Sequence, residues 1–257
     1  MSATIPTSNN PAAAKPVMRV IVVDLETGGL DANVHGTTEI AALSCTINAD
    51  YSVAQVASFQ QLVKPVSELA YTPIALRIQG RTLEYLDKYG VPEAEAWQGF
   101  TEFMRGEVAD KITSGKLYAH NAVFDHAFLA AMQNRCKQGG RAISPRCNFG
   151  CTKTLFHTCQ SLGIYDDFLP SSLRSLCTQF GILLDSDAAH SALEDAQATA
   201  QVLARILRDT EAHFVAKAER QAKAFRDERV QVVTDALSCF KAPSAPFAEL
   251  FAVSDWK

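Results

Sequence analysis

The chain has 257 residues, of which 47% are apolar and 20% charged, and its formal net charge is −4 at pH 7. These values are ordinary for a globular domain with appendages, and the sequence contains no run of about 18 apolar residues that would predict a membrane span. The negative charge argues against a basic coat for tight, non-specific duplex binding, but it is compatible with a nuclease whose catalytic cluster is acidic.

Residues 1–18 are rich in Ala, Ser, Thr, Asn and Pro and lack the apolar region of a secretory signal, so they predict a disordered leader. The first strand is predicted over 19–24, which reads RVIVVD, and a turn at Gly28-Gly29 follows it. Two more strands are predicted over 39–48 and 56–63. The turn residues Asn48-Ala49-Asp50 indicate that these two form a hairpin.

Helices dominate the rest of the chain. Pro73, directly after Thr72, and Pro92 each mark a helix start, because proline is favoured in the first helical turn. A short strand over 116–119 precedes helices predicted over 122–136, 173–180 and 192–208. Strands first, followed by helices with one further strand among them, indicate an α/β fold with a mixed sheet flanked by helices.

The composition changes after residue 208. Residues 210–239 form a charged, Ala-rich stretch with a helical pattern, and 241–257 contain KAPSAP and a few apolar and aromatic residues. We therefore predict a leader (1–18), one domain (19–208) and a helical C-terminal extension with a tail (209–257). The seven cysteines are scattered and odd in number, which is typical of reduced thiols and indicates a cytoplasmic protein.

The first motif that carries chemistry is Asp24-Leu25-Glu26-Thr27-Gly28-Gly29. Residues two apart on a strand project from the same face, so Asp24 and Glu26 place two carboxylates together at the end of an apolar strand. Such a pair needs neutralisation, for which a divalent cation is suited. The glycines allow another backbone, such as that of a nucleotide, to approach closely. Two solvated acids at an exposed strand end are the alternative.

The second motif is Ala119-His120-Asn121-Ala122-Val123-Phe124-Asp125, where the short strand passes into a helix. Asn121 is predicted to be the N-cap, which places Asp125 near the first turn, where the helix dipole favours a negative charge. Phe124 is predicted in the core. The alternative for Asp125 is an acid that only helps to cap the helix.

The third motif is His190-Ser191-Ala192-Leu193-Glu194-Asp195-Ala196. Ser191 and Glu194 have the spacing of a capping box, which makes Ser191 the N-cap. A helix that begins there lets His190, just before it, and Asp195, at the end of the first turn, face one site. A helix start with a surface histidine and a surface acid is the alternative.

The three motifs together place four acids and one histidine at the ends of strands and helices, where α/β folds have their active sites. Four clustered carboxylates can hold two divalent ions about 3.5–4 Å apart, an arrangement that serves phosphodiester hydrolysis. A histidine can accept the proton of the attacking water. The residue types predict two Mg²⁺ ions, with Mn²⁺ able to substitute.

The strings VVDLETGG, AHNAVFDHAFL and HSALEDAQATA resemble the three motifs of the DEDDh family of 3′→5′ exonucleases, which includes ribonuclease T and bacterial proofreading subunits. The resemblance spans 19–208 and implies a ribonuclease H-like fold. A sister subclass has tyrosine where Ser191 stands here, which favours the histidine subclass. The resemblance implies a general base at His190 and metal ligands at Asp24, Glu26, Asp125 and Asp195.

The expected activity is metal-dependent 3′→5′ hydrolysis of single-stranded DNA to nucleoside monophosphates, with substrate contacts at Thr27, Gly28, Asn121 and Phe124. Two alternatives share this chemistry: a ribonuclease T-like enzyme that trims RNA 3′ ends, and a proofreading subunit that works mainly within a polymerase complex. The sequence does not separate DNA from RNA, because the discriminating contact is with the ribose 2′-OH. Loss of an acid would favour a non-catalytic binding module, and all four acids are present.

Three weaker patterns concern metals and partners. Cys147, Cys151, His157 and Cys159 lack the C-x2-C spacing of a zinc site, which argues against zinc. The Lys and Arg residues of 217–229 recur every three residues among acids, which favours a solvated helix over a nucleic-acid contact. A homodimer, and a polymerase or sliding clamp bound through the C-terminal tail, stay open as partners.

Overall fold

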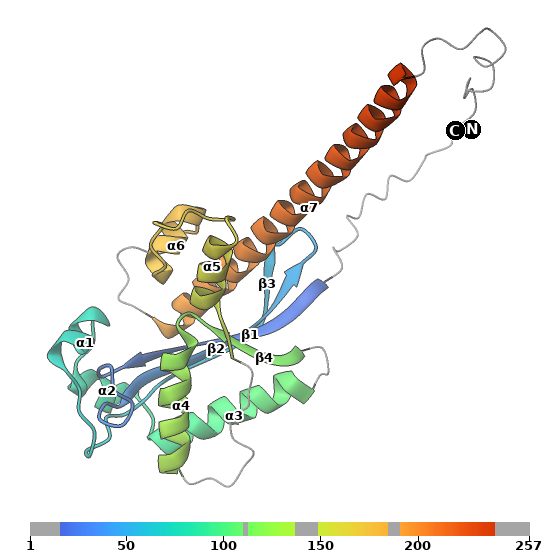
Figure 1. Ribbon diagram of the computed structural model, residues 1–257. Helices are drawn as coiled ribbons and strands as arrows, with labels where there is room; N and C mark the ends of the chain where they lie inside the picture. Colours follow the sequence, from blue (N-terminus) through green and yellow to red (C-terminus); the bar gives the residue numbers. More distant parts are fainter. Residues whose placement is uncertain (1–15, 110–112, 137–148, 185–190, 240–257) are drawn as a thin grey trace, which may run out of the picture. The chain divides into compact units, whose positions relative to one another are not determined.

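A computed structural model describes residues 16–109, 113–136, 149–184 and 191–239 of the chain (Figure 1). Its strands form one five-stranded sheet with the order β3-β2-β1-β4-β5. The strands β1 (Pro16–Thr27), β2 (Thr37–Asn48) and β3 (Val53–Leu62) are antiparallel neighbours. On the other side of β1, β4 (Thr113–Ala119) and β5 (Phe149–Cys151) run parallel to it. The predicted mixed sheet is confirmed.

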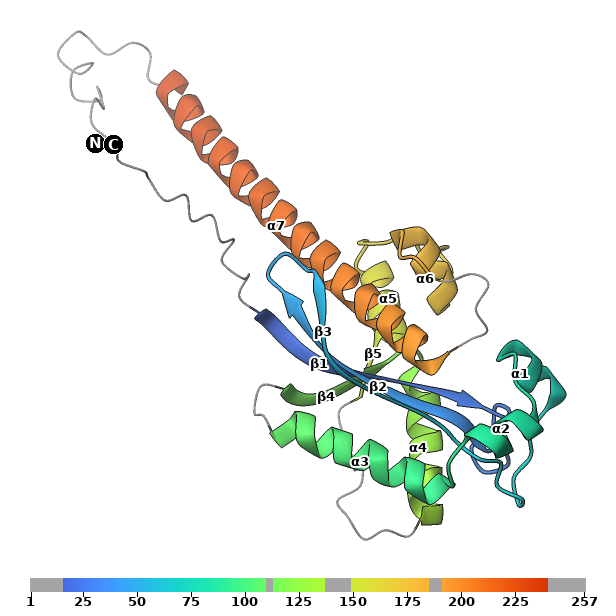
Figure 2. The same cartoon turned by 180° about the vertical axis from the view of Figure 1, so that it is seen from behind.

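Helices cover both faces of this sheet. They are α1 (Pro73–Ile78), α2 (Leu83–Tyr89), α3 (Glu93–Ala109), α4 (Ala122–Cys136), α5 (Thr152–Ser161), α6 (Leu173–Phe180) and α7 (Ala192–Cys239). Figures 1 and 2 show α3 and α4 on one face, and α5, α6 and the first turns of α7 on the other. Both views place α1 and α2 beyond the end of the sheet at which β1 finishes.

The side chains of β1 alternate between two apolar clusters. Ile21, Val23 and Leu25 belong to the core cluster that contains the buried residues of α3 and α4. Val20 and Val22 belong to a second cluster, which contains the apolar residues of the first part of α7. Because both faces are covered, β1 is apolar at successive positions rather than at alternate ones. The same alternation decides which helix the acids at the end of β1 face.

Several boundaries differ from the sequence expectations. β1 begins at Pro16, inside the predicted leader, and residues 1–15 lie outside the described part of the chain. Helix α2 was not predicted, although its N-cap, Thr82, accepts a hydrogen bond from the Tyr85 amide, which is an ordinary start signal. The strand β5 was not predicted either, because three residues are too few to show a period.

By its internal contacts the chain divides into two units, Met1–Asp209 and Thr210–Lys257. The first unit contains the sheet and the first part of α7. The described part of the second unit is helical as far as Cys239, and its side chains are mostly exposed. The tail after Cys239 lies outside the described residues. No helix in the described part of the chain is both long and apolar enough to span a membrane.

Candidate active site

Asp24 and Glu26 lie near the end of β1, where they alternate with Val23 and Leu25. Their side chains therefore share the strand face of Val20 and Val22, which is the face that α7 covers. The first turn of α7 contributes Asp195. Oxygen atoms of Asp24, Glu26 and Asp195 lie within 4.8 Å of one another, so the fold brings the first and third sequence motifs together.

Asp125 reaches the same region from the first turn of α4. It is 3% exposed, and its negative charge raises the pKa of Asp24, second only to burial in its effect. Burial also raises the pKa of Asp125 itself to about 7, although hydrogen bonding to the backbone amides of Asp125 and Leu25 acts in the opposite direction. Asp125 is thus a close neighbour of the group of three carboxylates without being one of them.

The cluster concentrates negative charge away from water. Burial, followed by the charges of Asp195 and Glu39, raises the pKa of Glu26 to about 8. Burial, followed by the surrounding acids, raises the pKa of Asp24 well above its usual range. Arg81 acts against this trend by lowering the pKa of Glu26. Desolvated, mutually repelling carboxylates are destabilised as anions unless a cation compensates them.

These residues fit a divalent cation. Carboxylate oxygens are the hard donors that such ions prefer, and the group is compact enough for its members to share an ion. Among the described residues it is the one group of three or more His, Cys, Asp and Glu side chains with such spacing. Cys151, His157 and Cys159 form no such group, and Cys147 lies outside the described residues.

The sequence profile of the RNase_T family, described as Exonuclease, matches residues 21–203. The chain belongs to this exonuclease family. Among its relatives, ribonuclease T of Baumannia cicadellinicola subsp. Homalodisca coagulata is 29% identical over 188 residues, which cover 73% of this chain and 82% of that protein. Ribonuclease T of Escherichia coli K12 is 28% identical over 188 residues, covering 73% and 83%. The DEDDh interpretation and the 3′→5′ exonuclease class are thereby confirmed.

Solved structures of exonuclease I have the same fold as this exonuclease. The enzyme of Methylocaldum szegediense matches with a TM-score of 0.60 and 20% identity, over 75% of this chain and 40% of that one. Escherichia coli exonuclease I in complex with a dT13 oligonucleotide matches with a TM-score of 0.62 and 20% identity, over 77% and 43%. The chain therefore spans less than half the length of these solved chains.

The turn that follows β1 is held by contacts with other residues of this chain. The Thr27 hydroxyl donates to the carbonyl oxygen of Gly29 at 2.7 Å. A Cβ at Gly28 would lie 2.6 Å from Tyr71 Cδ1 and 2.8 Å from the Ala70 carbonyl oxygen. The close approach that glycine allows here is therefore made by residues 70–71, whereas the sequence suggested a nucleotide backbone.

At the start of α4, Asn121 has a φ of 72°, in the left-handed region that asparagine tolerates. An N-cap residue has an extended backbone, so the predicted capping role is wrong. Phe124 is half-buried at the edge of the core, with its ring centroid 4.8 Å from that of Phe128. Asn121 is exposed, one turn before the buried Asp125.

The start of α7 also differs from the sequence expectation. The Asp195 amide donates to the Ser191 carbonyl oxygen at 3.0 Å, which is the first helical bond, but Glu194 is exposed and no capping box with Ser191 forms among the described residues. The Ala192 amide instead donates to a carboxylate oxygen of Glu39 at 3.0 Å. Glu39 was not among the predicted site residues, although an acid inside an apolar strand is a local signal. His190 lies outside the described residues.

The raised pKa values predict how the metal-free exonuclease responds to pH. Glu26 and Asp125 bind more protons when folded than when unfolded, so the free energy of unfolding should fall as pH rises from about 4.5 through about 8. A divalent cation compensates the same charges, so it should raise the melting temperature more at pH 8 than at pH 5. Calorimetric melting in EDTA and in Mg²⁺ at both pH values checks this.

The matched variant for this prediction is Glu26→Gln, which removes one of the titrating groups. Its melting temperature in EDTA should depend less steeply on pH than that of the wild type. An equal gain from Mg²⁺ at both pH values in the wild type would contradict the electrostatic account of the cluster.

Proposed function

We propose that this exonuclease hydrolyses single-stranded DNA from its 3′ end and releases nucleoside monophosphates. The observation that carries the proposal is the compact group of Asp24, Glu26 and Asp195 on one face of β1, with Asp125 beside it. The structures of Escherichia coli exonuclease I with dT13 and with 5cy-dA13 oligonucleotides favour single-stranded DNA as the substrate class.

In this proposal Asp24, Glu26, Asp125 and Asp195 hold two Mg²⁺ ions, which Mn²⁺ can replace. When bound, the ions supply positive charge that stabilises the transferred phosphate and acidifies water. His190, directly before Ser191, accepts a proton from the attacking water. The four carboxylates come from β1, α4 and α7. Because β1 packs with α4 in one apolar cluster and with α7 in the other, their oxygens are kept in a fixed arrangement.

The substrate side of the proposal uses the surface around Asp125 and the end of β1. Phe124 is half-buried beside Phe128, which leaves part of its ring for stacking with a terminal base. Asn121 is exposed at the same helix start, and its amide group can donate to a phosphate or a base. Thr27 and Gly28 directly follow Glu26 and form the turn past which the single-stranded nucleic acid would lie.

A ribonuclease T-like activity on RNA 3′ ends is the second candidate. It is favoured by relatives named ribonuclease T that match this chain over more than four-fifths of their own length. Both candidates use one cluster of carboxylates, so they differ only in how the sugar is recognised.

We also propose that residues 19–208 form the exonuclease domain, that 209–257 form a helical extension with a tail, and that removal of 210–257 leaves hydrolysis of short oligonucleotides largely intact. The family profile ends at residue 203, and the division by internal contacts falls after Asp209.

The test uses 5′-labelled single-stranded DNA and RNA of equal sequence, with Mg²⁺, with EDTA, and with EDTA followed by excess Mg²⁺. We expect products that shorten progressively from the 3′ end, no hydrolysis in EDTA, recovery with Mg²⁺, and faster hydrolysis of DNA. Faster hydrolysis of RNA would select the second candidate. Full activity in EDTA would refute the metal-dependent mechanism, and mononucleotides released first from the 5′ end would refute the polarity.

A further inference from the structure

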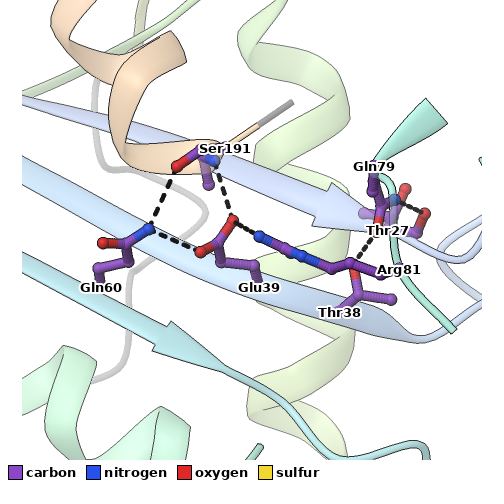
Figure 3. A network of polar contacts seen from close by, with 8 residues as sticks. Thr27, Thr38, Glu39, Gln60, Gln79, Arg81 and Ser191 are labelled. Carbon is purple, nitrogen blue, oxygen red and sulfur yellow. Dashed lines mark hydrogen bonds and ion pairs between the residues drawn. The ribbon is translucent and has the colours of Figure 1, made fainter. Parts of the chain in front are cut away.

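A buried polar network links the start of α7 to the sheet, and Figure 3 shows it with Glu39 at its centre. Glu39 lies on β2 and is 1% exposed. It is the cross-strand partner of Glu26, so both side chains project from the same face of the sheet. The first part of α7 covers this face of the sheet, because Leu43 and Cys45 of β2 belong to the same apolar cluster as the residues of α7.

The Glu39 carboxylate accepts hydrogen bonds from β3, from the segment between α1 and α2, and from α7. One oxygen accepts from Gln60 Nε2 of β3 at 2.8 Å. The other oxygen accepts from Arg81 Nη2 at 2.8 Å and from the Ala192 amide at 3.0 Å. Gln60 Nε2 also donates to Ser191 Oγ at 3.2 Å. Gln60 thus holds Ser191, directly before α7, and Glu39 holds Ala192, the first residue of the helix (Figure 3).

The hydrogen bonds to Ser191 and Ala192 hold the first turn of α7 in position on the sheet. Amide groups at a helix N-terminus have no partner within the helix, and the positive end of the helix dipole attracts an anion. Glu39 satisfies both conditions from outside the helix, where a capping box would satisfy them from within. Asp195 is in the same turn as Ala192, so the contact that holds Ala192 also sets the position of the Asp195 carboxylate.

Arg81 completes the arrangement as the cation paired with Glu39. Its Nη1 atom is buried and has no hydrogen-bond partner among the described residues, and its ion pair is with Glu39, although its charge also acts on Glu26. Close to Arg81, Gln79 accepts from Thr38 Oγ1 and donates to the Thr27 carbonyl oxygen, both at 2.7 Å. These bonds anchor the segment between α1 and α2 to the ends of β1 and β2 (Figure 3).

We propose that Glu39 is a positioning residue of the exonuclease, whose carboxylate holds the first turn of α7 on the sheet so that Asp195 meets Asp24 and Glu26. The inference rests on the proposed function in one respect, namely that these three carboxylates act together. Glu39 itself is directed toward Arg81, Gln60 and Ala192.

The test compares Glu39→Gln with Glu93→Gln in the full chain. Glu39→Gln keeps the shape of the side chain but removes the charge and one acceptor oxygen. Glu93→Gln is the matched control, because Glu93 also forms a partly buried ion pair, with Arg135 at 2.6 Å, which joins α3 to α4 on the other face of the sheet. Both variants should lose thermal stability, but only Glu39→Gln should alter the position of Asp195 relative to Asp24 and Glu26.

Four readouts are needed. For Glu39→Gln we expect kcat to fall and the Mg²⁺ concentration for half-maximal activity to rise, each by about 10–100-fold, the range for residues that orient metal ligands. KM for the oligonucleotide should change less than twofold. In metal-free protein, amide hydrogen exchange measured by NMR should accelerate at Ala192 and Asp195. Glu93→Gln should leave kcat, the Mg²⁺ requirement and these two amides within twofold of the wild type.

A folded Glu39→Gln variant with unchanged kcat and Mg²⁺ requirement would overturn the proposal, and so would a slower variant whose α7 amides exchange as in the wild type. If Glu39→Gln does not fold, the double variant Glu39→Gln/Arg81→Gln leaves no orphaned charge, and full activity in it would also overturn the proposal. If the wild type itself shows no Mg²⁺-dependent hydrolysis, the proposed function fails, whereas the exchange of Ala192 and Asp195 still decides whether Glu39 holds the helix.

Discussion

Asp24→Asn is expected to abolish hydrolysis, with a fall in the single-turnover rate of at least about a thousandfold, equivalent to about 4 kcal/mol of activation free energy. Asp24 is buried among Asp125, Asp195 and Glu26, all of which raise its pKa. The substitution preserves shape but removes one negative charge from the centre of the cluster. Calorimetry should show Mg²⁺ binding weakened together with the rate.

The same substitution should stabilise the metal-free protein. Because burial and the neighbouring acids raise the pKa of Asp24, its ionised form costs free energy in the folded state, and asparagine removes that cost. We therefore expect a higher melting temperature in EDTA at pH 8 and no activity in Mg²⁺. The control is Asp87→Asn, an exposed acid of α2. More than a tenth of the wild-type rate in Asp24→Asn would contradict its role as a metal ligand.

His190→Ala is expected to have the second largest effect, a loss of about 10²–10⁴-fold in the single-turnover rate at pH 7, which is the usual contribution of a general base. The four carboxylates remain, so Mg²⁺ affinity should stay within a few-fold of the wild type. Raising the pH from 7 to 10 should recover part of the lost rate, because hydroxide then becomes available without a base.

The measurements are single-turnover rates from pH 6 to 10 and calorimetric Mg²⁺ titrations. His213→Ala, in the helical extension, provides the control for loss of an imidazole. Near wild-type activity of His190→Ala at pH 7 would show that another group accepts the proton. The histidine carried over from the family resemblance would then have a different role.

The elements that the sequence predicted best are those with strong local signals. The bounds of α4 and α6 match the predicted ranges, and α6 begins after the N-cap Ser172 and ends at Gly181, which has a φ of 68°. The apolar run of β1 marked a strand in the same way. The strand β5 carried no such signal, since three residues contain no period.

The site was predictable only where its chemistry is local. The spacing of Asp24 and Glu26 was enough to place both carboxylates on one strand face, and that is where they lie. The role of Glu39 could not be seen in the same way, because its partners come from segments 21, 42 and 153 residues away along the chain. No local pattern encodes which buried acid meets which helix, so the network that holds α7 became visible only in the fold.

The two covered faces of β1 also constrain how this protein can change over evolutionary time. Inserting or deleting one residue between 19 and 23 would exchange the two faces of the strand, and would turn Asp24 and Glu26 into the apolar cluster beneath α3 and α4. Substitutions among Val, Ile and Leu in this stretch leave the faces in place. Related and engineered versions of the enzyme can therefore vary the apolar residues of β1, whereas insertions and deletions within this stretch are not tolerated.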